Sequence, residues 1–195
     1  MTGEGLAGEH AGYKMPLSNL LHMNVGQALA MDSAMVIAIS GRPFNSRRGR
    51  RMRSSRFSAN GPNAQLRPMF VQTLGDEDTR RDRMDMGLGV WNENMQKYYP
   101  VAVLREKGNY LLDEINGQKL LVFLDPLTST PTALYWDTDD VTIDGRNIAL
   151  SNGFTIQYGQ IYNSGGDLVA VEKPQQIFTR WYGFSLSFPN PDIFE

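Results

Sequence analysis

The chain has 195 residues, a formal charge of −2 at pH 7, two histidines and no cysteine. Its length suits one large domain or two small ones with a buried core. A chain without cysteine has no disulfides, zinc–thiolate sites, iron–sulfur clusters or thiol nucleophiles of its own, and no apolar run approaches the roughly 20 residues of a membrane span. The first residues lack a basic region followed by an apolar stretch, so no signal peptide is predicted here and the compartment stays open.

The N-terminal part predicts one helix and one strand. Apolar residues recur at helical spacing from Leu17 to Leu29, with Ser18 as a possible N-cap, which predicts a helix over about 19–30. Asp32-Ser33 predicts a turn, and the apolar run 34–39 predicts a buried strand.

The next stretch, 42–67, consists largely of Arg, Ser, Asn, Gly and Pro, which predicts a flexible linker. Seven arginines and no acidic residue lie between Arg42 and Arg56; without them the total of −2 would become −9. Any attraction to polyanions would be confined to this stretch, and its candidate contacts are Arg47, Arg48, Arg50, Arg51 and Arg53. Only Phe44 and Phe57 are available there for base stacking, so nucleic acid is not the expected partner.

After the linker, 68–74 predicts a strand and 75–83 a charged connection. From Met84 onward, short apolar runs predict strands at 88–91, 99–104, 119–124, 132–136, 141–143, 147–150, 155–158 and 168–171. The separators predict tight hairpins at Asn116-Gly117, Asp144-Gly145, Asn152-Gly153 and Gly165-Gly166. Residues 108–115 predict a short helix or turn, and 175–187 a helix that the prolines after it would end. The expected fold class is β-rich α+β, with short antiparallel strands, hairpins and a few helices.

A sequence pattern that occurs twice suggests two incomplete pseudo-repeats in the chain. A proline, an apolar helix, an Asp or Asn, and an apolar pair occur twice with an offset of 158 residues. The first copy runs from Pro16 to Val36, and the second from Pro174 to Phe194.

Five motifs carry a resemblance to a bacterial family: Gly89-Val90-Trp91, Tyr99-Pro100-Val101, the DEING run at 113–117, the LVFLDP run at 121–126 and the ending FTRWYGF at 178–184. In these motifs residues 87–195 resemble the family known as domain of unknown function 3179, and residues 2–8 look like a segment near the end of the same unit. The resemblance implies a first-unit tail at 1–41 (helix plus strand), a linker at 42–67 and a complete second unit at 68–195. Members of that family are often exported, but the localisation of this chain stays unknown.

One departure from that family concerns its chemistry. Family units often carry a Cys-Pro-Leu-Cys-like motif where this chain reads Asp125-Pro126-Leu127-Thr128. Thiol redox or thiolate metal chemistry therefore does not carry over to this unit. A thiol motif of the first unit would lie upstream of Met1.

Two groups of residues are binding candidates. Asp125 and Thr128 follow an apolar strand, where a pocket can open, although Asp-Pro with a nearby Thr is also a common turn. Arg180, Trp181 and Tyr182 form a dense amphipathic cluster. Besides ligand binding, this cluster suits a buried Trp181 next to an Arg180 that pairs with a carboxylate.

Other motifs predict neither a metal site, a cofactor nor a catalytic residue. In WDTDDVTIDG, four aspartates at 137, 139, 140 and 144 offer oxygen ligands, but an EF-hand loop starting at Asp137 needs glycine at its sixth position, where Thr142 stands. A solvated hairpin is predicted instead. His10 and His22 have no partner at motif spacing, and neither a Gly-x-Ser-x-Gly elbow nor a Walker loop is present in the sequence.

Three functions remain open. The leading hypothesis is a non-catalytic structural or ligand-holding part of a larger two-unit protein, whose partner would be a missing N-terminal unit or a second copy of the chain. The alternative is a fragment of a redox or metal-dependent enzyme with its thiol-bearing site upstream of Met1. A weaker alternative is polyanion binding through the Arg-rich stretch.

Overall fold

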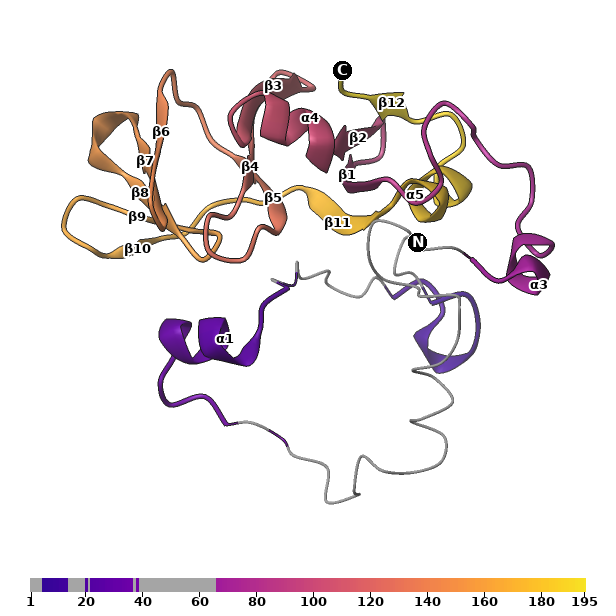
Figure 1. Ribbon diagram of the computed structural model, residues 1–195, viewed down its shortest axis with the longest axis horizontal. Helices are drawn as coiled ribbons and strands as arrows, with labels where there is room; N and C mark the ends of the chain where they lie inside the picture. The colour runs from indigo at the N-terminus through magenta and orange to yellow at the C-terminus, as the bar shows by residue number, and fades with distance from the viewer. Residues whose placement is uncertain (1–4, 14–19, 21, 37, 39–65) are drawn as a thin grey trace.

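The computed structural model describes residues 5–13, 20, 22–36, 38 and 66–195, and Figure 1 shows their arrangement. Within this part, the strands form three sheets with the orders β11-β1-β2-β12, β3-β4-β5 and β10-β9-β8-β7-β6. Most of the predicted linker, including all five candidate polyanion arginines, lies outside the described residues. The three-part division of the chain and its pseudo-repeats stay predictions.

The three-stranded sheet lies at the centre of the protein and consists of β3 (Tyr110–Ile115), β4 (Gln118–Leu124) and β5 (Pro131–Tyr135). Asn116 and Gly117 join β3 to β4 with positive φ at both positions, as a type I′ hairpin turn requires. Leu120, Val122 and Leu124 of β4 belong to one core cluster, while Leu121 and Phe123 belong to another. Because both faces of β4 are buried, its sequence is a continuous apolar run instead of an alternating one.

One face of the central sheet packs against the four-stranded sheet of β11 (Gln175–Arg180), β1 (Met86–Trp91), β2 (Gln96–Pro100) and β12 (Asp192–Ile193). β1 runs antiparallel to both neighbours, whereas β12 runs parallel to β2. Helix α4 (Val101–Glu106) follows β2 directly and adds Leu104 to the core that Leu88 and Tyr99 share with the central sheet.

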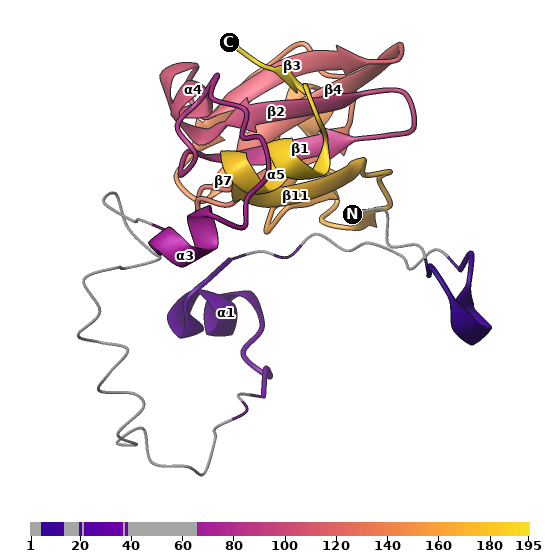
Figure 2. The ribbon, with the colours of Figure 1, turned by 90° about the vertical axis from the view of Figure 1, so that its right-hand side faces the viewer.

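The other face of the four-stranded sheet is covered by helix α5 (Trp181–Ser187), which Figure 2 shows lying across β1. Trp181 and Phe184 pack on Tyr98, with ring centroids 5.1 and 5.5 Å apart from it. The close approach depends on Gly89 of β1, because a Cβ there would lie only 2.2 Å from the Phe184 ring.

A five-stranded antiparallel meander covers the opposite face of the central sheet: β6 (Val141–Asp144), β7 (Asn147–Leu150), β8 (Thr155–Gln157), β9 (Gln160–Tyr162) and β10 (Leu168–Val169). A short 3₁₀ turn, η2 (Ser151–Gly153), separates β7 from β8. Ile148, Ile156 and Ile161 pack with the Leu121 and Phe123 side of β4. The layers are therefore the meander, the central sheet, the four-stranded sheet and α5.

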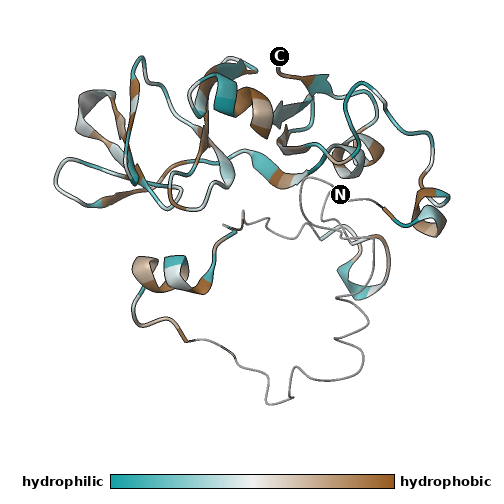
Figure 3. Ribbon diagram, viewed as in Figure 1, coloured by the Kyte–Doolittle hydropathy of each residue, from teal (hydrophilic) through white to brown (hydrophobic). Residues whose placement is uncertain are grey.

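The described N-terminal residues contain a 3₁₀ turn, η1 (Gly8–His10), and helix α1 (Val25–Met31). Asn24 and Gln27 form a reciprocal capping box at the start of α1. No residue of α1 is buried, and Figure 3 shows that the helix contains both polar and apolar residues.

The predictions before residue 75 need correction. Leu20 and residues 22–24 are not helical, so the helix begins at Val25, where the capping box fixes its start. Of the predicted strand 34–39, the described residues 34–36 and 38 form no strand, and Val36 is 91% exposed. The predicted strand 68–74 is helix α3 (Pro68–Val71), with Pro68 in the first turn, where a helix tolerates its missing N–H.

Three further element predictions are wrong in part. The predicted strand 99–104 ends at Pro100 and continues as α4, in which Val101 and Leu104 face the core three residues apart. The predicted helix or turn 108–115 is mainly strand β3. The predicted helix 175–187 divides into β11, which pairs with β1, and α5.

The predicted fold class is confirmed: the protein is a β-rich α+β fold of short, mostly antiparallel strands with a few helices. Among the described residues, no helix is both long enough and apolar enough to span a membrane.

Candidate functional site

The candidate residues Asp125 and Thr128 form the turn between β4 and β5. Asp125 is 1% exposed, and its Oδ1 accepts hydrogen bonds from the backbone N–H of Leu127 (3.1 Å) and Thr128 (2.8 Å) and from the Thr128 hydroxyl (2.9 Å). The Ser129 N–H closes the turn on the Asp125 carbonyl. One carboxylate oxygen thus serves three donors, so a ligand at Asp125 would have to compete with the bonds that shape the turn.

The same turn holds the N-terminal segment against the rest of the protein. The Thr130 hydroxyl accepts a hydrogen bond from the His22 N–H (3.0 Å) and donates one to the His22 carbonyl (3.3 Å). The Gln27 side-chain amide donates to the Leu127 carbonyl. The His22 ring lies edge-on to Phe178 at 5.3 Å. These contacts join parts of the chain that are 100 or more residues apart, and no local sequence signal indicates them.

Trp181 and Tyr182 lie at the start of α5. Trp181 is fully buried, and its indole N–H donates to the Asp78 carbonyl at 2.7 Å, while the Arg80 guanidinium lies 5.6 Å from the ring centroid. Tyr182 is half-buried and meets the Phe70 ring edge-on at 6.2 Å. Both side chains therefore contact neighbouring parts of the fold.

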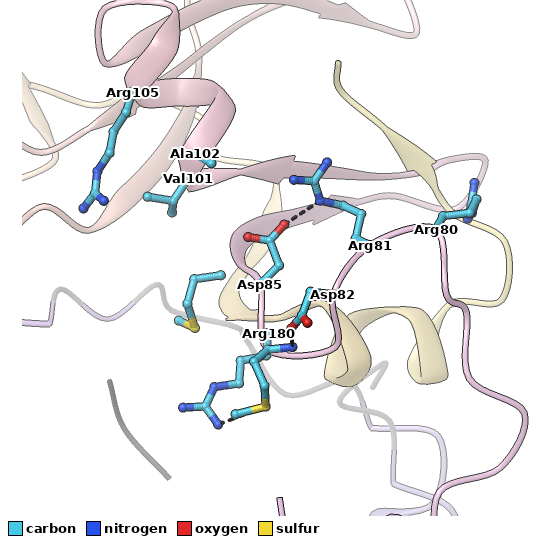
Figure 4. Close-up of a pocket in the computed structure, with 10 residues that line it drawn as sticks. Arg80, Arg81, Asp82, Asp85, Val101, Ala102, Arg105 and Arg180 are labelled. Atoms are coloured by element: carbon cyan, nitrogen blue, oxygen red, sulfur yellow. Dashed lines mark hydrogen bonds and ion pairs between the residues drawn. The ribbon is translucent and has the colours of Figure 1, made fainter. Parts of the chain in front are cut away.

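Arg180, the last residue of β11, borders a cavity of about 830 Å³. The connection before β1, the start of β1, α4 and the end of β11 surround it, because β1 pairs with β11 and α4 packs on β1. We call it the arginine cavity, and Figure 4 shows its lining residues: Arg80, Arg81, Asp82, Met84, Asp85, Met86, Val101, Ala102, Arg105 and Arg180.

The arginine cavity is rich in positive charge, with four arginines and two aspartates among its lining residues. Arg81 forms an ion pair with Asp85, and Arg80 forms one with Asp78. The hydrogen bond to the Asp78 carboxylate raises the pKa of the Arg80 guanidinium. Arg105 is exposed on α4. Figure 4 shows the Arg105 and Arg180 guanidinium groups apart from each other, both to the left of the Arg81–Asp85 pair.

The cavity also has an apolar part. Met84, Met86, Val101 and Ala102 contribute to its lining, and the Arg180 Nη1 lies 3.8 Å from the Met84 sulfur. Guanidinium groups recognise carboxylates and phosphates through paired N–H donors. The described lining residues include no Ser, Thr, Tyr, His or Lys that would act as nucleophile or proton-transfer group. The arrangement suits binding of an oxyanion attached to an apolar body.

A second group of charged residues has perturbed pKa values but is satisfied internally. The Lys97 ammonium (2.6 Å) and the Tyr99 hydroxyl (2.7 Å) both donate to Asp113 Oδ2. Burial alone would raise the pKa of Asp113, yet these hydrogen bonds outweigh it and hold the pKa below its usual value. Burial, together with the hydrogen bond to Asp113, raises the pKa of Tyr99. The group links β2 to β3 and has a structural role.

Sequence reasoning identified Arg180 but not the other residues of the arginine cavity. Arg81 and Asp85 lie in or beside a stretch interpreted as a charged connection, and Arg105 follows a segment predicted as a strand. The helical spacing of Val101 and Leu104 would have placed Arg105 on the outer side of a helix. That Arg105 and Arg180 line one cavity depends on the β1–β11 pairing and on the packing of α4 on β1, which the local sequence does not indicate.

The remaining candidates among the described residues lie on the surface. The four aspartates of the 137–144 segment are all exposed, and His10 is exposed as well. In the part of the chain that is described, no group of three or more His, Asp or Glu side chains is arranged to hold a metal ion. Comparison with known proteins adds no relative, because no family model, curated protein or solved structure matches this chain.

Proposed function

We propose that this chain is a non-catalytic, ligand-holding domain whose arginine cavity binds a small oxyanion attached to an apolar body. The observation that carries the proposal is the position of Arg105 and Arg180 beside one cavity that Met84 and Met86 also line. The resemblance to family 3179 adds a proposal about setting, namely that the domain works as one half of a larger two-unit protein.

The expected affinity is modest. A hydrogen bond to a charged group contributes about 1.5–3 kcal/mol when it is well formed, and a guanidinium near the surface contributes towards the lower end of this range. Two such contacts with some apolar burial predict a dissociation constant between about 10 µM and 1 mM. Since Arg105 is exposed, binding should weaken as salt screens the charges.

Isothermal titration calorimetry with phenyl phosphate and inorganic phosphate tests the proposal. Phenyl phosphate should bind more tightly, because only its ring can contact the apolar lining. Replacing Arg105 by Gln should weaken binding about tenfold, the loss of roughly 1.4 kcal/mol. The matched control is Arg146→Gln in the β6–β7 turn, an exposed arginine that does not line the cavity.

The methionine methyl groups give a second measurement. In ¹³C-methyl-methionine spectra, phenyl phosphate should shift the signals of Met84 and Met86, which line the cavity. Equal affinity for the two phosphates, unchanged Met84 and Met86 signals, or the same loss of affinity in the Arg105 and Arg146 variants would contradict the proposal.

A further inference from the structure

A second cavity lies between the N-terminal segment and the sheets. Its volume is about 290 Å³. One wall is apolar and comes from the N-terminal segment, with Leu20, Met23, Met31 and Met35. Methionine side chains are flexible and polarisable, so a wall made of them can adapt to apolar ligands of varied shape. We call this cavity the methionine cavity.

The opposite wall is polar and comes from the sheets. It includes Thr132 of β5, the Tyr158-Gly159 turn between β8 and β9, and Lys173. Both turn residues have positive φ. The Tyr158 hydroxyl donates a hydrogen bond to the Ala30 carbonyl at 3.3 Å. The turn thereby contacts the helix that contributes Met31 to the first wall.

Two groups of the polar wall have unused hydrogen-bonding capacity. The Thr132 hydroxyl is buried and has no hydrogen-bond partner among the residues that the structure describes. The Lys173 ammonium donates to the Gly159 carbonyl at 3.1 Å, which uses one of its three N–H donors. Lys173 is exposed as a residue, but partial desolvation of its ammonium lowers its pKa. A ligand oxygen would provide a partner for both groups.

We infer that the methionine cavity is a binding site for a medium-chain carboxylate, with the alkyl chain against Met23, Met31 and Met35 and the carboxylate near Lys173 and Thr132. Charge complementarity with Lys173 selects a carboxylate over a neutral apolar molecule. The volume corresponds to about ten groups of water size at ~30 Å³ each, which suits octanoate with its eight carbons and two oxygens. The site is separate from the arginine cavity and does not depend on it.

The test uses the full chain, sodium octanoate as the probe and ¹³C-methyl-methionine spectra. The chain has ten methionines. Octanoate should shift the signals of Met23, Met31 and Met35 with a dissociation constant near 1 mM, and these shifts should persist in Arg105→Gln, which separates them from any binding of octanoate in the arginine cavity. Octanol, which has no charge, should bind about tenfold more weakly, and acetate, which has no chain, should cause no shift.

Two variants identify the polar wall. Lys173→Gln should weaken octanoate binding about tenfold, whereas Lys107→Gln, at an exposed lysine that follows α4, should leave it unchanged. Thr132→Val removes the unpartnered hydroxyl while keeping the shape. It should therefore raise the melting temperature of the ligand-free protein and still weaken octanoate binding.

Three results would overturn the inference. The first is no shift of Met23, Met31 and Met35 at 20 mM octanoate. The second is unchanged affinity in Lys173→Gln. The third is a shift of Met84 and Met86 in place of the other three, which would place octanoate in the arginine cavity and so support the proposed function while refuting the second site.

Discussion

Substitution of Asp125 distinguishes between two roles for this residue, a structural one in the turn and a ligand-binding one. Asp125→Ala removes the acceptor of three hydrogen bonds inside a turn that is anchored between two central strands. Each bond to the charged oxygen contributes about 1–2 kcal/mol, and water replaces part of this because Leu127 and Thr128 are only half-buried. We expect the free energy of unfolding to fall by about 2–4 kcal/mol. Asp125→Asn keeps an oxygen acceptor and the shape, so it should cost about 1 kcal/mol.

Urea unfolding followed by tryptophan fluorescence measures this difference, with Asp139→Ala, at an exposed residue, as the control. For the 130 described residues from 66 to 195, a change of about 3 kcal/mol corresponds to a fall in melting temperature of roughly 10 °C. The melts are repeated with EDTA and with Ca²⁺, Mg²⁺ or Zn²⁺. A cost below about 1 kcal/mol for Asp125→Ala would refute the turn reasoning. So would a metal-dependent stabilisation that both Asp125 variants lose.

Three further substitutions test the packing. Gly89→Ala should destabilise the protein by more than about 2 kcal/mol in urea unfolding, because its Cβ would lie 2.2 Å from the Phe184 ring; a cost below about 0.5 kcal/mol would contradict the close approach. Trp181→Phe removes the bond to the Asp78 carbonyl and should cost about 1–3 kcal/mol, and a neutral result would contradict the role of that bond. The carboxylate of Asp113 has a pKa below its ordinary 3.8, so its stabilising contribution is complete above about pH 5 and is lost as the pH falls through the lowered value. Melts between pH 2 and 6 should therefore show a smaller loss of stability in Asp113→Asn, and parallel curves for the two proteins would refute this.

Hairpins and buried strands are the elements that the sequence predicts best here. Asn116-Gly117 takes the two positive φ values that few other residue pairs accept, so its local chemistry is enough to predict the turn. The LLVF run at 120–123 is too apolar for a surface strand and is buried on both faces. In both cases the signal lies within a few residues of the structure that it predicts.

Predictions fail where distant parts of the chain decide the structure. Residues 175–180 become a strand because β1 provides a hydrogen-bonding edge, and the helix begins only where that pairing ends. The run 34–39 predicts a strand from its composition alone, but its described residues have no neighbouring strand. The arginine cavity could not be predicted for the same reason, because two of its lining residues, Arg105 and Arg180, are 75 positions apart in the sequence.

The attachment of the N-terminal segment has a thermodynamic consequence. Helix α1 buries no residue, and the segment is held by a few hydrogen bonds to the 125–130 turn and to Tyr158. Such contacts are too weak to hold a separate peptide, so the docked state relies on the high effective concentration that a covalent connection provides. The methionine cavity takes one wall from this segment and the other from the sheets. Any ligand that binds both walls must therefore stabilise the docked state of the segment. By linkage, a change that destabilises the docked state must lower the affinity for the ligand.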